Sequence, residues 1–253
     1  MRLRFTRDPH EAGALIAKRF TALVVTIGAA AASAVAVAGS SSSSGYEPVL
    51  RASNFVSVID NRYFPLPVGR VWVYKGVKDG QTQIDTVRVL AQTKLVAEGI
   101  RARVVSDIAT HGSKVLEKTF DWYAQDTQGN VWYLGEDTTA YLPNGKQDTS
   151  GSWEAGVDDG EPGLIMEAAP KVPDAYRQEY LAGQAEDTAW IVSGPDSLTV
   201  PYGTVRHVLT SLEATRLEPG LYDKKVYAPG IGIVLERTVT GPTEIAKLVS
   251  MKG

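Results

Sequence analysis

Alternating hydrophobicity dominates this chain after residue 70. From Val71 to Val96, in VWVYKGVKDGQTQIDTVRVLAQTKLV, apolar residues recur near every second position, and Lys78-Asp79-Gly80 supplies a turn. The segment from Ile100 to Asp126 continues the pattern, with His111-Gly112 at the tip of a second hairpin. A period of two indicates strands with one buried face, so we expect long antiparallel strands here.

Shorter runs of the same kind follow, separated by turn signals such as Pro219-Gly220. We expect strands over Ala175–Ala182, Asp187–Val192, Thr204–Leu217, Leu221–Ala228 and Ile233–Thr240. Many short strands at hairpin spacing are typical of an antiparallel sheet that is closed or strongly curved. The predicted fold class is mainly β, a strongly curved antiparallel sheet or incomplete β-barrel with at most one or two short helices. Pro48–Asp60 is the best helix candidate, and Thr243–Met251 fits either a helix or a strand.

The first 39 residues do not follow this pattern. Five basic residues precede an uncharged run from Phe20 to Ala38, which ends in small residues suited to a signal peptidase. We therefore expect residues 1–39 to be a signal peptide. Because the run approaches the ~20 residues that span a bilayer, a retained anchor is the alternative. We interpret residues 40–45 as a Ser-rich spacer and residues 46–253 as a single β domain.

Net charge limits the partners. Five of the 26 basic and two of the 29 acidic residues precede Gly39, which leaves 21 against 27, a net charge of −6 with His neutral. This balance argues against nucleic acid as a partner. The chain has no cysteine, so an exported form relies on a hydrophobic core instead of disulfides. We expect an extracellular or envelope-associated protein with no membrane span after signal cleavage.

The segment DWYAQDTQGNVWYLGED, residues 121–137, is dense in aromatic and acidic side chains. Asp126 to Asn130 suits a three-residue hairpin loop with Gly129 in the left-handed conformation. Pairing the ends of this loop places Asp121, Tyr123, Gln125, Val131 and Tyr133 on one face, and Phe120, Trp122, Trp132 and Leu134 on the other. In this register Asp121 and Glu136 point to opposite faces. We interpret the segment as a structural hairpin, and the alternative is a binding surface of Tyr123, Tyr133 and Asp121.

A carboxylate-dependent hydrolase, such as a glycosidase, is one hypothesis. Its candidate catalytic residues are Asp121, Glu136, Asp137, Glu154 and Asp159. Two of them would have to lie within about 10 Å on one face, one with a raised pKa. The predicted register argues against this, although a slip of one residue would reverse the conclusion. The sequence has no Gly-x-Ser-x-Gly motif of a serine hydrolase, no cysteine nucleophile, no phosphate-binding glycine-rich loop and no dinucleotide-binding fingerprint. His111 and His207 lack the spacing of zinc ligands.

The acidic loop GSWEAGVDDGEPG, residues 151–163, is a weak candidate for Ca²⁺ binding. Glu154, Asp158, Asp159 and Glu161 could supply oxygen ligands, but their spacing matches no known calcium loop. We interpret the loop as a solvated turn and predict no cofactor, with Ca²⁺ as the alternative. Trp153 is interpreted as an anchor onto the sheet, and it joins Tyr123, Tyr133 and Asp121 as a candidate ligand-binding residue.

Four stretches resemble an uncharacterised family of exported bacterial β-rich proteins. They are NRYFPLPVGRVWVY, FDWYAQDTQGNVWYLGED, GSWEAGVDDGEPGLIM and VYAPGIGIVLE. The pattern Tyr-Ala-Pro-Gly-Ile-Gly-Ile-Val is also similar to segments in lipoprotein-carrier (LolA-like) half-barrel envelope proteins, which hold acyl chains against a concave sheet. The lipobox cysteine of the lipidated members is missing here, and the resemblance implies a fold more than a function.

Three hypotheses about function follow. The first is a non-catalytic binding or carrier domain, whose aromatic and aliphatic concave sheet takes a lipid or another amphiphile. The second is the carboxylate-dependent hydrolase. The third is an envelope domain that binds another protein and no small ligand. The first hypothesis fails if side chains fill the interior completely, and the second fails if the acids lie on separate surfaces.

Overall fold

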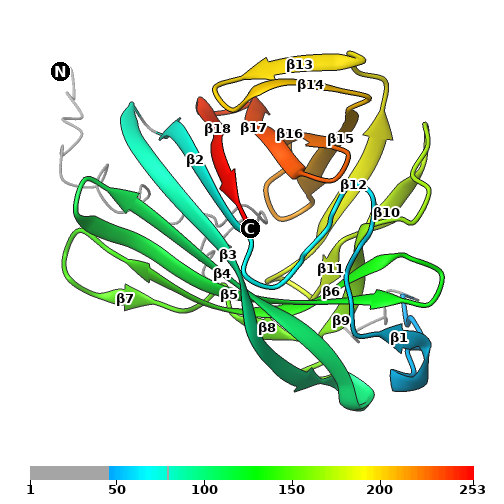
Figure 1. Ribbon diagram of the computed structural model, residues 1–253. Helices are drawn as coiled ribbons and strands as arrows, with labels where there is room; N and C mark the ends of the chain where they lie inside the picture. The colour runs from blue at the N-terminus through cyan, green and yellow to red at the C-terminus, as the bar shows by residue number, and fades with distance from the viewer. Residues whose placement is uncertain (1–45, 79) are drawn as a thin grey trace, which may run out of the picture.

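The computed structural model describes residues 46–78 and 80–253, so the predictions for residues 1–39 and 40–45 lie outside the described residues. The described chain is mainly β, as predicted. One antiparallel sheet curves into a nearly closed barrel with one unsealed seam (Figure 1), in the order β10-β12-β15-β16-β17-β18-β2-β3-β4-β5-β6-β9-β11. A separate hairpin of β13 and β14 lies beside it.

The elements have the following bounds. The strands are β1 (Phe55–Val56), β2 (Val71–Lys78), β3 (Gln81–Val96), β4 (Ile100–His111), β5 (Lys114–Asp126), β6 (Val131–Tyr141), β7 (Gln147–Asp148), β8 (Trp153–Glu154), β9 (Glu161–Met166), β10 (Ala175–Arg177), β11 (Glu179–Tyr180), β12 (Asp187–Val192), β13 (Ser197–Val200), β14 (Gly203–Arg206), β15 (Leu209–Thr215), β16 (Tyr222–Ala228), β17 (Gly232–Thr240) and β18 (Glu244–Lys252). Two 3₁₀ turns, η2 (Ala52–Asn54) and η3 (Ala97–Gly99), complete the described structure.

Both helix candidates adopt other structures. The segment Pro48–Asp60 contains only η2 and β1, and Phe55 of β1 pairs with Asp126 of β5. The prediction of a helix there is wrong, because pairing with an existing sheet edge outweighs a weak local preference. The segment Thr243–Met251 is a strand, since β18 closes the sheet between β17 and β2. No helix in the described part of the chain has the length and hydrophobicity to cross a bilayer.

The apolar core draws on strands from all around the barrel. Its fully buried members include Ile100, Val131, Leu134, Met166, Val234 and Leu248, each with 0 % of its surface exposed. They belong to one contiguous cluster of buried residues, and a small second cluster surrounds Tyr176, Ala189 and Ile191. Packing across the sheet therefore fixes the curvature that the strand pattern alone only suggests.

The seam of the barrel is crossed by the chain itself. β10 pairs with β12 at one end of the sheet, β11 pairs with β9 at the other, and only Gln178 separates β10 from β11. The backbone N–H of Gln178 donates to the carbonyl of Asp187 at 2.8 Å. One short segment thus holds both ends of the sheet together.

We expect Gly163→Ala to weaken this seam. A Cβ at Gly163 would overlap the carbonyl carbon of Gln178, and such overpacking against backbone costs about 3 kcal/mol of unfolding free energy, the upper end of the usual range. Chemical denaturation followed by circular dichroism measures the loss. Gly183→Ala is the control, because its Cβ meets no atom within 4 Å and only the φ of +75° is unfavourable. Equal losses in the two variants would show that the close approach is absent.

A segment without helix or strand, residues 57–70, crosses the end of the barrel between β1 and β2 (Figure 1). We call it the strap. It turns Ile59, Phe64 and Leu66 inward, with 4 to 7 % of each exposed. The Asn61 side chain fastens one side by donating to the carbonyls of Gly129 and Glu167 at 2.9 and 3.0 Å. The Arg62 carbonyl fastens the other side by accepting from the N–H of Gly230 at 2.8 Å.

Candidate functional site

The loop of the aromatic hairpin has the predicted geometry. Gly129 has a φ of +94°, and the N–H of Asp126 donates to the carbonyl of Asn130 at 2.9 Å. Tyr123 lies opposite Tyr133, as the predicted register requires. Local sequence therefore determined the turn and the first strand pairs.

A β-bulge further along the hairpin changes the register. The pairing shifts by one residue between Asp121 and Tyr123, so Asp121 lies opposite Glu136 instead of Gly135. Direct cross-strand partners share a face, and only 2 % of Asp121 and 1 % of Glu136 are exposed. The prediction that these two carboxyls point to opposite faces is wrong, because the bulge inserts one extra residue. Gly135 permits the distortion with a φ of +126° and leaves room for the carbonyl of Trp153.

The four predicted ligand-binding residues lie together inside the barrel. The rings of Tyr123 and Tyr133 stack with centroids 5.0 Å apart, and Trp153 meets Tyr133 edge-on at 5.4 Å. The Tyr133 hydroxyl donates to Asp121 Oδ1 at 3.0 Å. Trp153 is 4 % exposed and anchors β8 onto the sheet, in the role that the sequence suggested for it.

Asp121 and Glu136 belong to a larger group of buried carboxyls, which we call the carboxyl belt. Its members are Asp107, Glu117, Asp121, Glu136, Glu179, Asp187 and Glu213, each with at most 5 % of its surface exposed. They come from strands on both sides of the seam. Charged groups are rarely buried without compensation, so this belt is the most unusual feature of the interior.

Lys225 on β16 supplies a buried positive charge to the belt. Its Nζ lies 2.7 Å from Glu213 Oε2, and 1 % and 2 % of the two side chains are exposed. Ser211 and Tyr227 donate their hydroxyls to Glu213 Oε1 at 2.8 and 3.2 Å. Burial lowers the pKa of Lys225, but its carboxylate neighbours, chiefly Glu213, outweigh burial and hold that pKa above its usual value. Lys225 therefore stays charged at neutral pH.

Burial raises the pKa of several carboxyls of the belt. Burial raises the pKa of Asp187 to about 8, although Lys225 lowers it. Burial, and then the charge of Asp107, raise the pKa of Asp121 well above its usual range, while the hydrogen bond from Tyr133 lowers it. Burial, followed by the charges of Asp187 and Glu136, raises the pKa of Glu179. Transferring these groups out of water favours their neutral form.

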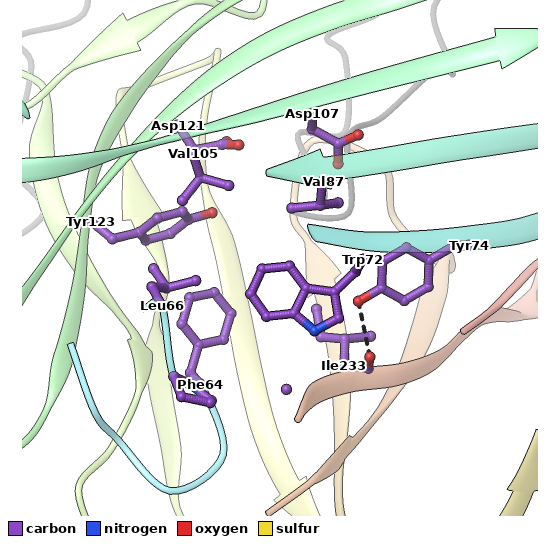
Figure 2. A pocket seen from close by; sticks show the side chains of 12 residues that line it. Phe64, Leu66, Trp72, Tyr74, Val87, Val105, Asp107, Asp121, Tyr123 and Ile233 are labelled. Atoms are coloured by element: carbon purple, nitrogen blue, oxygen red, sulfur yellow. Dashed lines mark hydrogen bonds between the residues drawn. The ribbon is translucent and has the colours of Figure 1, made fainter. Parts of the chain in front are cut away.

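A cavity reaches the belt beneath the strap, and we call it the strap cavity (Figure 2). Its walls are mostly apolar and aromatic, and include Phe64, Leu66, Trp72, Tyr74, Val87, Val105, Tyr123 and Ile233. Asp107 and Asp121 lie on the side away from Phe64 and Leu66. The volume is about 40 Å³, which is space for about three waters at roughly 10–15 Å³ each.

Most polar groups in the cavity wall are already bonded elsewhere. Trp72 donates its indole N–H to the carbonyl of Ile231 at 2.8 Å, and Tyr74 donates its hydroxyl to the carbonyl of Ile233 at 3.0 Å. The Tyr123 hydroxyl differs, because it is buried and has no hydrogen-bond partner among the described residues. Figure 2 shows this hydroxyl directed toward the space beside Val105 and Trp72. A buried donor without a partner is costly, so this hydroxyl is the one polar group of the lining described here whose hydrogen-bonding capacity is left open.

The predicted catalytic acids divide between the interior and the surface. Asp121 and Glu136 are buried together, whereas Asp137 and Asp159 are exposed and Glu154 pairs with Lys94 at 2.8 Å. Asp121 lines the strap cavity, but Glu136 is absent from the described lining. The structure therefore brings one carboxyl pair together without a described opening that reaches both members.

Of the candidate calcium ligands, Asp158 and Asp159 lie in the turn between β8 and β9, Glu154 ends β8 and Glu161 begins β9. Asp158 and Asp159 have φ values of +50° and +63°, the left-handed geometry of a tight turn. Within residues 46–78 and 80–253, no group of three or more His, Cys, Asp or Glu side chains converges on a position that could hold a metal ion. Glu154 and Glu161 are only partly buried.

Sequence reasoning missed Asp107, Lys225, Glu213 and the strap residue Phe64. Asp107 alternates with Val105 and Ala109 on β4, so it is in phase with buried apolar residues. Lys225 alternates in the same way with Tyr227. A charged residue in phase with the buried face of a strand is the signal that could have revealed the belt. Phe64 carried no such signal, because the strap has no periodic pattern.

No family model and no curated protein matches the sequence. Two solved structures are similar in fold. One is a Bacteroides fragilis protein assigned as exported, with a YmcC-like fold, and it has 17 % identity, a TM-score of 0.44 and coverage of 76 % of this chain and 100 % of its own. The other is a Parabacteroides distasonis protein assigned as a lipoprotein, with 14 % identity, a TM-score of 0.43 and the same coverage. At these identities and scores, function has to be inferred from the site itself.

Proposed function

We propose that this chain is an exported, non-catalytic binding protein that takes a small amphiphile in the strap cavity. The observation that supports it most is the composition of that cavity, in which aromatic and aliphatic side chains surround the unpartnered hydroxyl of Tyr123. Small-molecule sites usually combine a concave apolar lining with a few polar groups that orient the ligand. The hydrolase alternative is weaker, because a substrate would have to reach two carboxyls that are almost fully buried.

The size of the cavity limits how the ligand binds. Buried tyrosines and the carboxyl belt occupy the concave side of the sheet, which leaves little space for an acyl chain lying along it. The cavity volume of about 40 Å³ is that of the closed form. We infer that Phe64 and Leu66 move outward on binding, since both belong to the strap and cover the end of the cavity opposite the two carboxyls. The apolar part of the ligand would then replace their contacts.

Filling the cavity is expected to abolish binding. Val105 is 3 % exposed and lines the cavity, so Val105→Phe should lower the affinity for a bound amphiphile at least about tenfold. Isothermal titration calorimetry of the full chain with eight-carbon amphiphiles measures the change. Val115→Phe is the matched control, because Val115 on β5 is 38 % exposed and its replacement should leave the affinity unchanged.

A second variant tests the same site in the opposite direction. Leu66→Ala enlarges the cavity from the strap side and should shift the preferred ligand toward longer apolar chains. Circular dichroism of both cavity variants checks that they are folded. The proposed function fails if the unmodified chain binds none of the amphiphiles, or if Val105→Phe binds them as well as Val115→Phe does.

A further inference from the structure

We propose that the outer face of strands β16, β17, β18, β2 and β3 is a docking surface for the anionic head groups of a lipid membrane. These strands are consecutive neighbours in the sheet (Figure 1), and we call their outward side the basic face. It lies on the opposite side of the sheet from the strap cavity and does not depend on the proposed function. Its support comes from the sorting of charge between the two faces, from pairs of like charges and from an adjoining apolar groove.

Basic side chains point outward from all five strands. Each one is next to a buried residue in its strand: Lys247 precedes Leu248, which is 0 % exposed, and Arg88 lies between Val87 and Val89, which are 7 % and 1 % exposed. Successive side chains of a strand point to opposite faces. The basic face therefore carries Lys75, Arg88, Lys224, Arg237 and Lys247.

The acidic side chains of the same strands point inward. Direct cross-strand partners share a face, and each of these acids has a partner that is at most 7 % exposed. The pairs are Asp223 with Glu213, Glu236 with Lys225, Glu244 with Lys78, and Asp85 with Tyr74. No Asp or Glu of these five strands therefore points outward to neutralise the basic face.

Two pairs of like charges lie directly opposite each other on the basic face. Lys224 is the cross-strand partner of Arg237, and Lys75 is the partner of Lys247. Within the described residues, none of these four side chains forms an ion pair. Like charges in opposite positions destabilise a sheet. Anionic groups bound over these pairs would relieve that repulsion.

An apolar groove adjoins the basic face on the side of β15 and β12. Trp190 pairs with Leu212, and Leu212 pairs with Lys224, so the groove and the basic pair belong to one cross-strand row. The groove has a volume of about 520 Å³, and Val172 and Tyr222 also line it. Trp190 and Tyr222 are 38 % and 41 % exposed. Such rings favour the boundary between lipid head groups and acyl chains, beside the heads that the basic pair would contact.

The width of the basic face favours a membrane over one small anion. Neighbouring strands lie about 4.8 Å apart, so five strands spread their charges over about 19 Å. One phosphate could contact only one of the like-charge pairs, whereas a membrane presents many anionic heads at once. Val77 and Val239 also point outward here, with 39 % and 46 % exposed. Apolar side chains among the charges suit a bilayer better than an acidic protein surface, which is polar.

Vesicle co-sedimentation of the full chain tests the proposal. Vesicles of equal parts phosphatidylglycerol and phosphatidylcholine are compared with vesicles of phosphatidylcholine alone. Lys224→Gln with Arg237→Gln should lower the partition coefficient onto the anionic vesicles at least about tenfold, because each basic residue near such a surface adds to binding. Residues 1–45 are identical in every variant, so a difference between variants reports the sheet.

The matched control is Arg51→Gln with Lys146→Gln. It removes two exposed basic residues, one just before η2 and one between β6 and β7, and should change the partition coefficient less than about twofold, since these lie away from the basic face. The Lys224 and Arg237 double variant should also keep its midpoint of thermal unfolding, because it removes a repulsion. Loss of vesicle binding would then not be a loss of folding.

Three results would overturn the membrane assignment. The first is equal partition of the two double variants onto anionic vesicles. The second is equal partition of the unmodified chain onto both kinds of vesicle. The third is displacement of most of the bound chain by poly-L-glutamate at the same concentration of negative charge as the lipid, which would assign the basic face to an acidic protein. We expect poly-L-glutamate to leave most of the chain on the vesicles.

Discussion

Replacing Lys225 by methionine is expected to lower the free energy of unfolding by about 3–5 kcal/mol, the cost of leaving one partner of a buried ion pair without the other. Lys225 and Glu213 are 1 % and 2 % exposed, so water cannot compensate the remaining charge. Methionine is an unbranched side chain of similar length to the aliphatic part of lysine. The substitution therefore removes mainly the charge and little of the packing. Urea denaturation of the variant and the unmodified chain measures the difference.

The double variant Lys225→Met with Glu213→Gln is the control for this prediction. Removing both charges should recover much of the lost stability, because a neutral pair carries no desolvated charge. Glutamine can still accept the hydroxyl hydrogen bonds that Ser211 and Tyr227 donate to Glu213. A loss below about 1 kcal/mol in the single variant would mean that the pair is solvated, because exposed pairs contribute about that much.

The protein is expected to be more stable near pH 5 than near pH 8, by a few kcal/mol. Asp187 has a pKa of about 8 in the folded chain, against 3.8 for the unperturbed group. Between these values the unfolded chain has released the proton and the folded chain has not, so each such group lowers stability by up to about 1.4 kcal/mol per pH unit as pH rises. Asp121 and Glu179 act in the same direction.

This pH effect has a defined window and a specific control. Below about pH 4 the carboxyls are protonated in both the folded and the unfolded chain, so these groups do not change the stability there. Once the pH exceeds the folded pKa of a group, that group causes no further loss of stability. The pKa of Lys225 is raised above 10.5, so its contribution persists throughout this window and is lost only in more alkaline solution. Asp187→Asn should flatten the slope, whereas exposed Asp137→Asn should not. Thermal unfolding from pH 4 to pH 9 measures both, and a stability that rises toward pH 8 would refute the prediction.

The candidate site was only partly predictable from local sequence. Tyr123, Tyr133 and Asp121 were identified, because a short loop around Gly129 determines which side chains of the first pairs share a face. The pairing of Asp121 with Glu136 was not predicted, because the bulge lies where Gly135 closely approaches Trp153 of β8, a residue distant from the hairpin loop. A register that changes within a hairpin reverses the face of every later residue.

By itself, the sequence determined the strands, the antiparallel sheet and the turn of the aromatic hairpin, because these depend on period-two alternation and on residues close together in the chain. Only the tertiary structure decided which face became the interior and that the strap covers one end. Those outcomes depend on contacts between distant residues, such as Asn61 with Gly129 and Glu167. The burial of Asp107, Glu213 and Lys225 follows from barrel closure, because a side chain becomes interior only when strands remote in sequence surround it.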